Sequence, residues 1–365
     1  MAFQVSPGVL VQERDLTKII PAVSTSIGAF AGSFNKGPLD EIVSISSEQE
    51  LVETFGKPDS SNFEYFFSAA NFLQYSNSLR VVRATQTSAV NASTSGTGVL
   101  IKNTDDWTNN YASGGSAGNA DFVAREAGTD GNNLLVSVCP NATAYEQNAV
   151  TTLNDTSTSV GDTTVTVTSG TGINVGDILS FSTTAATNDY DDGEQYRVTG
   201  VSTNDITIVQ HPRGTGGLKR ELTDGCNIRR RWRYYDSVDG APGTSAYVSD
   251  RNGSGDELHV VVVDEDGGIS GVPGTILETY SNVSKASDAK DPQGNDNYYP
   301  NVIYTKSRHI WWTKHNSSGS NWGNAASGTT YTAVNTPTSE SLSGASNGST
   351  VTTGQLKDAY DKFAD

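Results

Sequence analysis

The stretch of sequence that decides the fold of this protein is residues 47–84, SEQELVETFGKPDSSNFEYFFSAANFLQYSNSLRVVRA. It opens with Ser47 and Glu50 at the spacing of a capping box, in which each side chain accepts a hydrogen bond from a free amide at the helix start. We expect a short helix from this point to Phe55, because Gly56 follows and favours the left-handed turn that ends helices. The lysine and proline after it complete the break.

A second helix and a strand complete this stretch. Residues 79–84, LRVVRA, predict a strand with at least one buried face. Upstream, the small apolar residues 26–34 and then residues 41–45 predict two more strands. Residues 22–90 therefore predict a compact α/β unit with the element order β-β-α-α-β. The second helix is indicated by apolar residues at the spacing of one helix face, namely Phe63, Phe66, Phe67, Ala70 and Leu73.

The chain begins with an extended arm, MAFQVSPGVLVQERDLTKII, which ends at Pro21. Pro7 and Gly8 make a turn or a stiff bend, and the alternating residues after them lack one clean buried face. A single strand cannot satisfy its own backbone groups, so the arm gains little by folding alone. Two interpretations stay open from the residues themselves. The arm is either a strand donated to the sheet edge of another chain or an edge strand of its own domain.

Residues 150–228 differ in pattern from the rest of the chain. Short alternating segments with turn residues between them occur over 160–168, 173–181, 195–201 and 205–209. This regular spacing of short strands is typical of a small antiparallel barrel or sandwich. We expect an all-β domain inserted at the surface.

The strands of a larger core lie on both sides of this insertion. Residues 258–264, LHVVVVD, form a nearly continuous apolar run of the kind that is buried on both faces. Residues 134–138 and 275–283 predict two further strands. Residues 91–120 are rich in Ser, Gly, Asn and Thr, and we expect them to form a long surface excursion.

Composition restricts the class of protein. A chain of 365 residues suggests two or three domains. Only 18% of the residues are charged and 35% are hydrophobic, a balance common in β-rich extracellular or virion proteins. The formal net charge of −17 argues against a phosphate-binding surface. It also predicts that packing against identical copies depends on salt.

The two cysteines, Cys139 and Cys226, are too few for a disulfide framework. The N-terminus lacks the basic and apolar regions of a secretory signal. No stretch approaches the roughly 20 apolar residues that span a bilayer. We therefore expect a soluble protein made in a reducing cytoplasm, with no membrane insertion.

The sequence predicts no enzyme, no metal site and no cofactor. The acidic residues 189–194 lack the ligand pattern of a calcium loop, and residues 264–268 suit a hairpin turn. The four histidines lack metal-binding spacing, and no nucleophile elbow or phosphate loop is present. His259 lies in a buried strand, where a hydrogen-bonded core residue is expected. Trp311 and Trp312 suggest strand packing.

One basic aromatic cluster occurs, at residues 229–235, RRRWRYY. Basic residues interleaved with aromatic ones can bind single-stranded nucleic acid by stacking. In a chain this acidic, the pattern suits a domain junction or a salt-bridged subunit contact better. As a strand it places alternate residues on opposite faces, with Arg229, Arg231 and Arg233 on one and Arg230, Trp232 and Tyr234 on the other.

Taken together, these residues resemble the contractile tail sheath proteins of myoviruses, the T4-like and cyanophage group. The resemblance is sharpest at LVETFGKP (51–58) and at YFFSAANFLQY (65–75) followed by residues 79–84. One departure is Ala345, where family members usually carry a second glycine. The other motifs are SPGV (6–9), residues 28–38, GDELHV (255–260), NVSKA (282–286), LSG (342–344) and DAYDKFAD (358–365).

The resemblance implies a mixed α+β fold: an α/β sheath core domain, incomplete at its C-terminus, with an inserted all-β barrel or sandwich and an extended N-terminal arm. Family members continue well past the helix that we expect over 353–363, begun by Thr352 or Thr353. We therefore expect an N-terminal portion that carries the donor arm without its acceptor. The implied divisions are an arm at 1–21, a discontinuous core at 22–149 and 229–341, an insertion at 150–228, and the start of the next domain at 342–365.

The resemblance also implies a function and partners. Such a subunit polymerises as stacked hexameric rings around the tail tube and contracts to drive the tube through the host envelope during genome ejection. Its partners would be further copies, the tail tube, baseplate and tail terminator proteins, and not nucleic acid. It would reside in the virion tail, and in the host cytoplasm during assembly. The implied strand exchange favours donation of the arm, whose predicted subunit contacts are Phe3, Val5, Val9, Val11, Leu16, Ile19 and Ile20.

Two alternatives from other classes stay open. The first is a virion receptor-binding or decoration protein that uses the 150–228 domain as its binding surface. The second, weaker alternative is a hydrolase of cell-wall polymer, which needs a paired-carboxylate site that the sequence does not locate.

Overall fold

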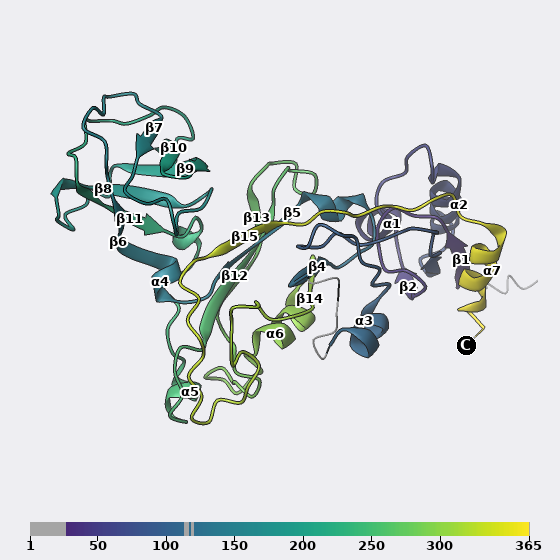
Figure 1. The fold of residues 1–365 in the computed structure, drawn as a ribbon. Coiled ribbons are helices and arrows are strands. Elements are labelled where there is room, and N and C mark those ends of the chain that lie inside the picture. Colours follow the sequence, from purple (N-terminus) through teal and green to yellow (C-terminus); the bar gives the residue numbers. More distant parts are fainter. Residues whose placement is uncertain (1–26, 113–116, 118–119, 365) are drawn as a thin grey trace, which may run out of the picture.

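The computed structural model describes residues 27–112, 117 and 120–364. Three parts follow one another along the molecule (Figure 1): a β-barrel at one end, a central body, and a small α/β unit at the other end. We call them the barrel (residues 146–231), the body, and the α/β module (residues 27–84 with 350–364). The mixed α+β fold is thus confirmed.

The α/β module contains the stretch that we expected to decide the fold. Its strands β1 (Gly28–Gly32), β2 (Ile42–Ile45) and β3 (Leu79–Arg83) form a sheet in the order β1-β3-β2, with β1 parallel and β2 antiparallel to β3. Helices α1 (Glu48–Phe55) and α2 (Phe63–Leu73) cover one face, and α7 (Thr353–Asp361) covers the other. The order β-β-α-α-β is confirmed.

Two cores form because successive residues of β3 face opposite sides of the sheet. Leu79 and Val81 pack under α1 and α2, whereas Val82 packs under α7. Of the two hydrogen bonds that make up the predicted capping box, only one forms at the start of α1. The Ser47 hydroxyl accepts from the Glu50 amide, but the Glu50 carboxylate accepts from Ser46 instead.

The body is built on an antiparallel sheet in the order β13-β12-β5-β15. Leu258, Val260 and Val262 of β12 face the largest core, while Val261 and Val263 face a second core around Trp232. Burial on both faces explains the unbroken apolar run of this strand. The sheet strands are β5 (Leu134–Cys139), β12 (Glu257–Asp264), β13 (Thr275–Ser284) and β15 (Thr338–Ser341).

Shorter elements complete the body. A two-stranded sheet pairs β4 (Phe122–Ala124) with β14 (Ile310–Trp312). The α-helices are α3 (Thr104–Asn110), α4 (Ala142–Tyr145), α5 (Ala246–Ser249) and α6 (Tyr299–Lys306), and the 3₁₀ turns are Thr129–Asn133 and Tyr235–Ser237.

The prediction that residues 91–120 form a surface excursion is wrong. Ala92 and Ile101 lie in the main core, and Trp107 of α3 is buried beside them. The Trp107 ring stacks on Trp311, and its Nε1 donates to the Trp312 carbonyl at 2.8 Å. Asn91 supports this burial, since its side chain donates to the carbonyls of Ile101 and Ala124 and accepts from the Ile101 amide.

The inserted strands form a closed barrel rather than a sandwich. Their order is β6-β11-β8-β9-β10-β7, and a bridge between Leu153 and Val167 joins the two outer strands. Its interior is a separate apolar core. The strands are β6 (Glu146–Thr152), β7 (Thr164–Thr166), β8 (Ile178–Ala185), β9 (Gln195–Ser202), β10 (Asp205–His211) and β11 (Cys226–Arg231). Among the described residues, no helix is both long and apolar enough to cross a bilayer.

Candidate assembly surface

The predicted subunit contacts all fall in the arm, which lies outside the described residues. They are Phe3, Val5, Val9, Val11, Leu16, Ile19 and Ile20. The first described residue is Ile27, directly before β1 of the α/β module. The surface that follows the arm in the chain is therefore the edge of this module's sheet.

Within the described part of the chain, β1 pairs with β3 alone, so its other edge is open. Gly28 and Gly32 allow α2 to pack closely over this strand. A Cβ atom on Gly28 would lie 2.5 Å from the Phe72 ring, and one on Gly32 would lie 2.8 Å from Tyr65. An open edge offers amide and carbonyl groups to another strand.

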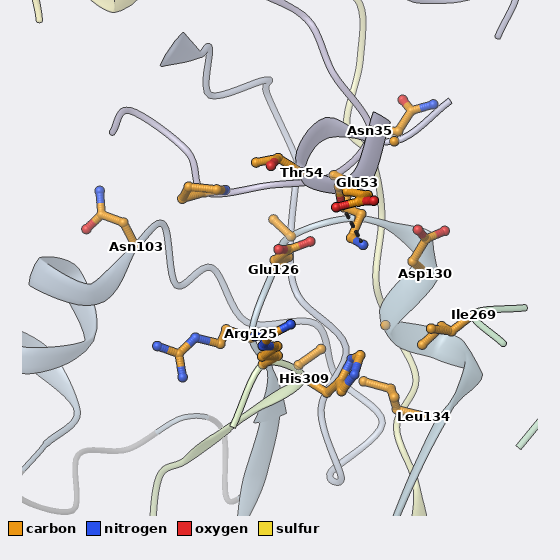
Figure 2. A pocket seen from close by; sticks show the side chains of 18 of the residues that line it. Asn35, Glu53, Thr54, Asn103, Arg125, Glu126, Asp130, Leu134, Ile269 and His309 are labelled. Atoms are coloured by element: carbon orange, nitrogen blue, oxygen red, sulfur yellow. Dashed lines mark hydrogen bonds between the residues drawn. The ribbon is translucent and has the colours of Figure 1, made fainter. Parts of the chain in front are cut away.

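A groove with a cavity of about 990 Å³ separates the α/β module from the body. Asn35, Glu53 and Thr54 line its module side, and residues 124–134 and 307–311 line much of its body side. Figure 2 shows their side chains around one hollow. Cations and carboxylates both line the groove, so it lacks the single sign of charge that would select a charged ligand.

Arg125 stabilises the body side of the groove by contacts to the end of α6 and to Trp311. One guanidinium nitrogen, Nη1, donates to the carbonyls of Tyr304 at 3.2 Å and Ser307 at 2.6 Å, at the end of α6. Its Cζ lies 3.8 Å from the centre of the Trp311 ring. Burial lowers the pKa of Arg125, and nearby Glu278 opposes this shift. The arginine thus acts as a cap for α6 and as a cation stacked on an indole.

Arg83 fastens the α/β module to the body. Its Nη1 donates to the carbonyls of Gly37 and Ala127, each at 2.8 Å. The Gly37 amide in turn donates to the Glu126 carboxylate at 3.1 Å. Burial lowers the pKa of Arg83 to about 10 and raises the pKa of Glu126. These contacts join the end of β3 to two loops from different parts of the chain.

The basic cluster joins the barrel to the body. Arg230 and Trp232 are fully buried, and the Trp232 Nε1 donates to the Ser137 hydroxyl at 2.8 Å. Arg231 pairs with Glu146 at 2.5 Å and with Asp192 at 3.1 Å. The domain-junction interpretation is confirmed, but the strand ends at Arg231, so the predicted alternation of a strand does not extend over residues 232–234. Because these arginines are paired or buried, they do not form an open cationic surface.

The remaining candidate residues from the sequence have structural roles. His259 Nε2 lies 2.8 Å from the Gly240 carbonyl, and its Nδ1 accepts from the Asn282 amide, so the core-histidine prediction is confirmed. Trp311 and Trp312 are buried in β14, as predicted. Within the described ranges, no three His, Cys, Asp or Glu side chains gather as a metal site.

The turn predicted over 264–268 is present, since Asp264 accepts from the Ser270 amide and hydroxyl. The acidic loop 189–194 does more than form a solvated turn. Its Asp192 pairs with Arg229 and Arg231 of the barrel junction.

Sequence reasoning missed Arg83, Glu126 and Arg125. The one available signal was an arginine at the end of a buried strand, since such a side chain needs acceptors nearby. The acceptors come from residues 37 and 127, and no local pattern connects these positions.

Comparison with known proteins gives a match over the α/β module. Residues 25–84 match the family described as tail sheath protein Gp18, domain III N-terminal region. The chain is 46% identical over 79 residues to the tail sheath protein of Enterobacteria phage T4 and 40% identical over 78 residues to that of Vibrio phage KVP40. These matches cover 22% and 21% of this chain, and 12% of the length of each relative.

Among solved structures, the sheath tail protein Lin1278 from Listeria innocua is similar over 55% of this chain and 32% of its own length. It is 12% identical, with a TM-score of 0.20. The resemblance to myovirus tail sheath proteins is confirmed over the N-terminal portion of the chain. The receptor-binding alternative is not favoured by these relatives.

Proposed function

From the N-terminal region that it shares with myovirus tail sheath proteins, we propose that this chain is a structural subunit of a bacteriophage contractile tail sheath. The observation that carries the proposal is the match of residues 25–84, of which residues 27–84 form most of one α/β module with an open sheet edge. The subunit polymerises as stacked hexameric rings around a tail tube. It contracts to drive the tube through the host envelope during genome ejection.

The proposal places the protein in the virion tail, and in the host cytoplasm during assembly. Its partners are further copies of the chain, the tail tube protein, and the baseplate and tail terminator proteins. It assigns the chain no catalytic activity and no cofactor. The division into arm (1–21), core (22–149 and 229–341), insertion (150–228) and C-terminal segment (342–365) belongs to the same proposal.

Exchange of arms gives this function a physical basis. A strand donated by one subunit keeps its backbone hydrogen bonds to a neighbour while side-chain surfaces slide past each other. Subunits can then rotate without dissociating. Work comes from the difference in free energy between the extended and the contracted packing.

The test is deletion of residues 1–20. We expect the deleted protein to keep the circular dichroism spectrum and the unfolding midpoint of the full chain, because residues from Phe30 onward pack against one another in the apolar cores of the module and the body. We also expect it to form no sheath-like tubes in electron micrographs under conditions in which the full chain forms them. Tubes assembled from the deleted protein would refute the role of the arm.

A further inference from the structure

The outer side of α2 carries a row of exposed aromatic residues. Phe63 is 47% exposed, Phe67 is 50% exposed and Tyr75, just past the helix end, is 90% exposed. Together with Asn71 they follow one another at i, i+4 spacing, so they lie along one side of the helix. We call Phe63, Phe67 and Tyr75 the aromatic row.

The α/β module does not need this row for its own core. The inner side of α2 fills the core with Phe66, Ala69 and Ala70. Phe67 is held in place, since its ring lies perpendicular to that of Phe66 with the centroids 5.6 Å apart. Figure 1 shows α2 at the end of the molecule away from the barrel.

The exposed area of the row, which Asn71 interrupts, is comparable with the largest apolar patch of a typical monomer, and such patches are often functional. Aromatic side chains bury about 150–250 Å² each in a core, so two half-exposed rings and one nearly free ring amount to roughly 400 Å². Monomeric proteins rarely expose contiguous apolar patches above a few hundred Å², and larger ones mark binding sites.

The charge of the same segment indicates the partner. Residues 65–79, YFFSAANFLQYSNSL, contain no charged residue, although the chain is 18% charged and has a net charge of −17. Phe63 lies just outside this segment, beside the exposed Glu64. Identical acidic copies repel each other wherever like charges meet. They can approach at an uncharged aromatic surface without this cost, and a basic partner would gain nothing there.

We propose that the aromatic row of α2 is a contact between copies of this chain. The inference rests on the proposed function, which requires such contacts, and it names one surface that makes them. A stable interface buries about 800 Å² per partner. The row supplies about half of this area, so it is the centre of a wider contact, where aromatic anchors contribute most of the binding energy.

The first experiment compares association of the full chain and of the double variant Phe63→Ser/Phe67→Ser by sedimentation velocity over a concentration series. We expect the double variant to associate at least tenfold more weakly. Phe67→Leu keeps an apolar side chain and should lose less. The matched control is Val160→Ser/Val272→Ser, which removes two apolar side chains that are 66% and 62% exposed elsewhere. Circular dichroism establishes that each variant is folded.

The second experiment uses Ser68→Cys, on the exposed side of α2, with a cysteine-to-amine cross-linker. The two natural cysteines are buried. We expect cross-links between labelled and unlabelled copies, and fewer from Ser202→Cys on the barrel. Equal association of the double variant and the full chain would overturn the proposal, as would cross-links confined to one copy or a monomer at every concentration.

The two proposals fail differently. Tubes that form normally from the double variant would overturn the α2 contact and leave the sheath function intact. Association that depends on α2 but never produces tubes would support the contact and count against the sheath function.

Discussion

At the scale of single residues, Gly344 occupies a position that requires glycine. It lies where the chain crosses residues 96–98 with φ of +83°, and a Cβ there would lie 2.6 Å from the Gly98 amide nitrogen. We expect Gly344→Ala to lower the free energy of unfolding by more than about 2 kcal/mol, since a left-handed backbone alone costs about 1–2 kcal/mol. Urea unfolding measures the loss.

Gly271→Ala is the matched control for this prediction. Gly271 has nearly the same φ, +86°, but a Cβ there would meet nothing within 4 Å. Gly271→Ala therefore has the free-energy cost of a left-handed backbone but no steric clash. If both variants lost the same free energy of unfolding, the contact between Gly344 and residues 96–98 would not explain the effect. The next residue, Ala345, needs no such freedom, since it is not among the residues with positive φ.

His315 makes stability depend on pH. Its Nδ1 and Nε2 lie 2.6 Å and 3.1 Å from the hydroxyls of Tyr299 and Tyr298, and burial lowers its pKa to about 4. In the unfolded chain the pKa is about 6.5, so between these values the unfolded state binds more protons. The free energy of unfolding should therefore fall as pH drops from about 6.5 to about 4, by up to about 1.4 kcal/mol per pH unit.

Comparison with His315→Gln isolates this contribution, because all other titrating groups stay the same. We expect the variant to be less stable at pH 7, through lost packing, but to lose less stability on acidification. Urea unfolding at several pH values between 4 and 7 gives both slopes. Parallel curves for the two proteins would contradict the assignment.

At the scale of elements, α7 stabilises the α/β module from a distant part of the sequence. Ala359 is fully buried against the sheet face that holds Ala31 and Val82. We expect Ala359→Glu to detach α7 and to cost about 3 kcal/mol or more, because it buries an unpaired carboxylate. Hydrogen exchange in β1 and β3 would speed up. Asp358→Glu, at the exposed neighbouring position, should leave both exchange and stability unchanged.

Elements with a strong local pattern could be predicted from the sequence. The two helices of the module, the buried strand β12 and the alternating strands of the barrel all have apolar periodicity that local propensity supports. Helix α3 was missed because Trp107 is its one buried apolar residue, and β15 because its residues, TSES, are polar. Their burial or pairing depends on partners from elsewhere in the chain.

In the candidate assembly surface too, the features that depend on residues far apart in the sequence could not be predicted. Residues 27–84 of the module could be predicted because they are continuous in sequence, whereas the arm lies outside the described residues and stays a prediction. The groove and the contacts of Arg83 could not be predicted, because they join loops around residues 37 and 127. The aromatic row shows a further limit, since the sequence predicted one apolar face for α2 that included Phe63 and Phe67. These two phenylalanines are half exposed, because they lie on the flank of the helix and Phe66, Ala69 and Ala70 are the residues that face the core.

At the scale of the whole molecule, charge opposes self-association. With a net charge of −17, copies repel over the Debye length, which falls from about 30 Å at 0.01 M salt to about 8 Å at 0.15 M. We expect the association constant of the full chain to rise several-fold over this range of sodium chloride, measured by light scattering. Sucrose at equal osmolality should have no such effect. Association that weakens with salt would mean that opposite charges dominate the contact.

The way in which the barrel joins the body has a consequence for engineering. The chain enters the barrel through β6 and leaves it through β11, and these strands pair side by side, with Glu146 opposite Arg231. The entry and exit points are therefore about 5 Å apart. Any foreign domain whose two ends lie equally close could be grafted in place of the barrel, so this position could serve for protein display.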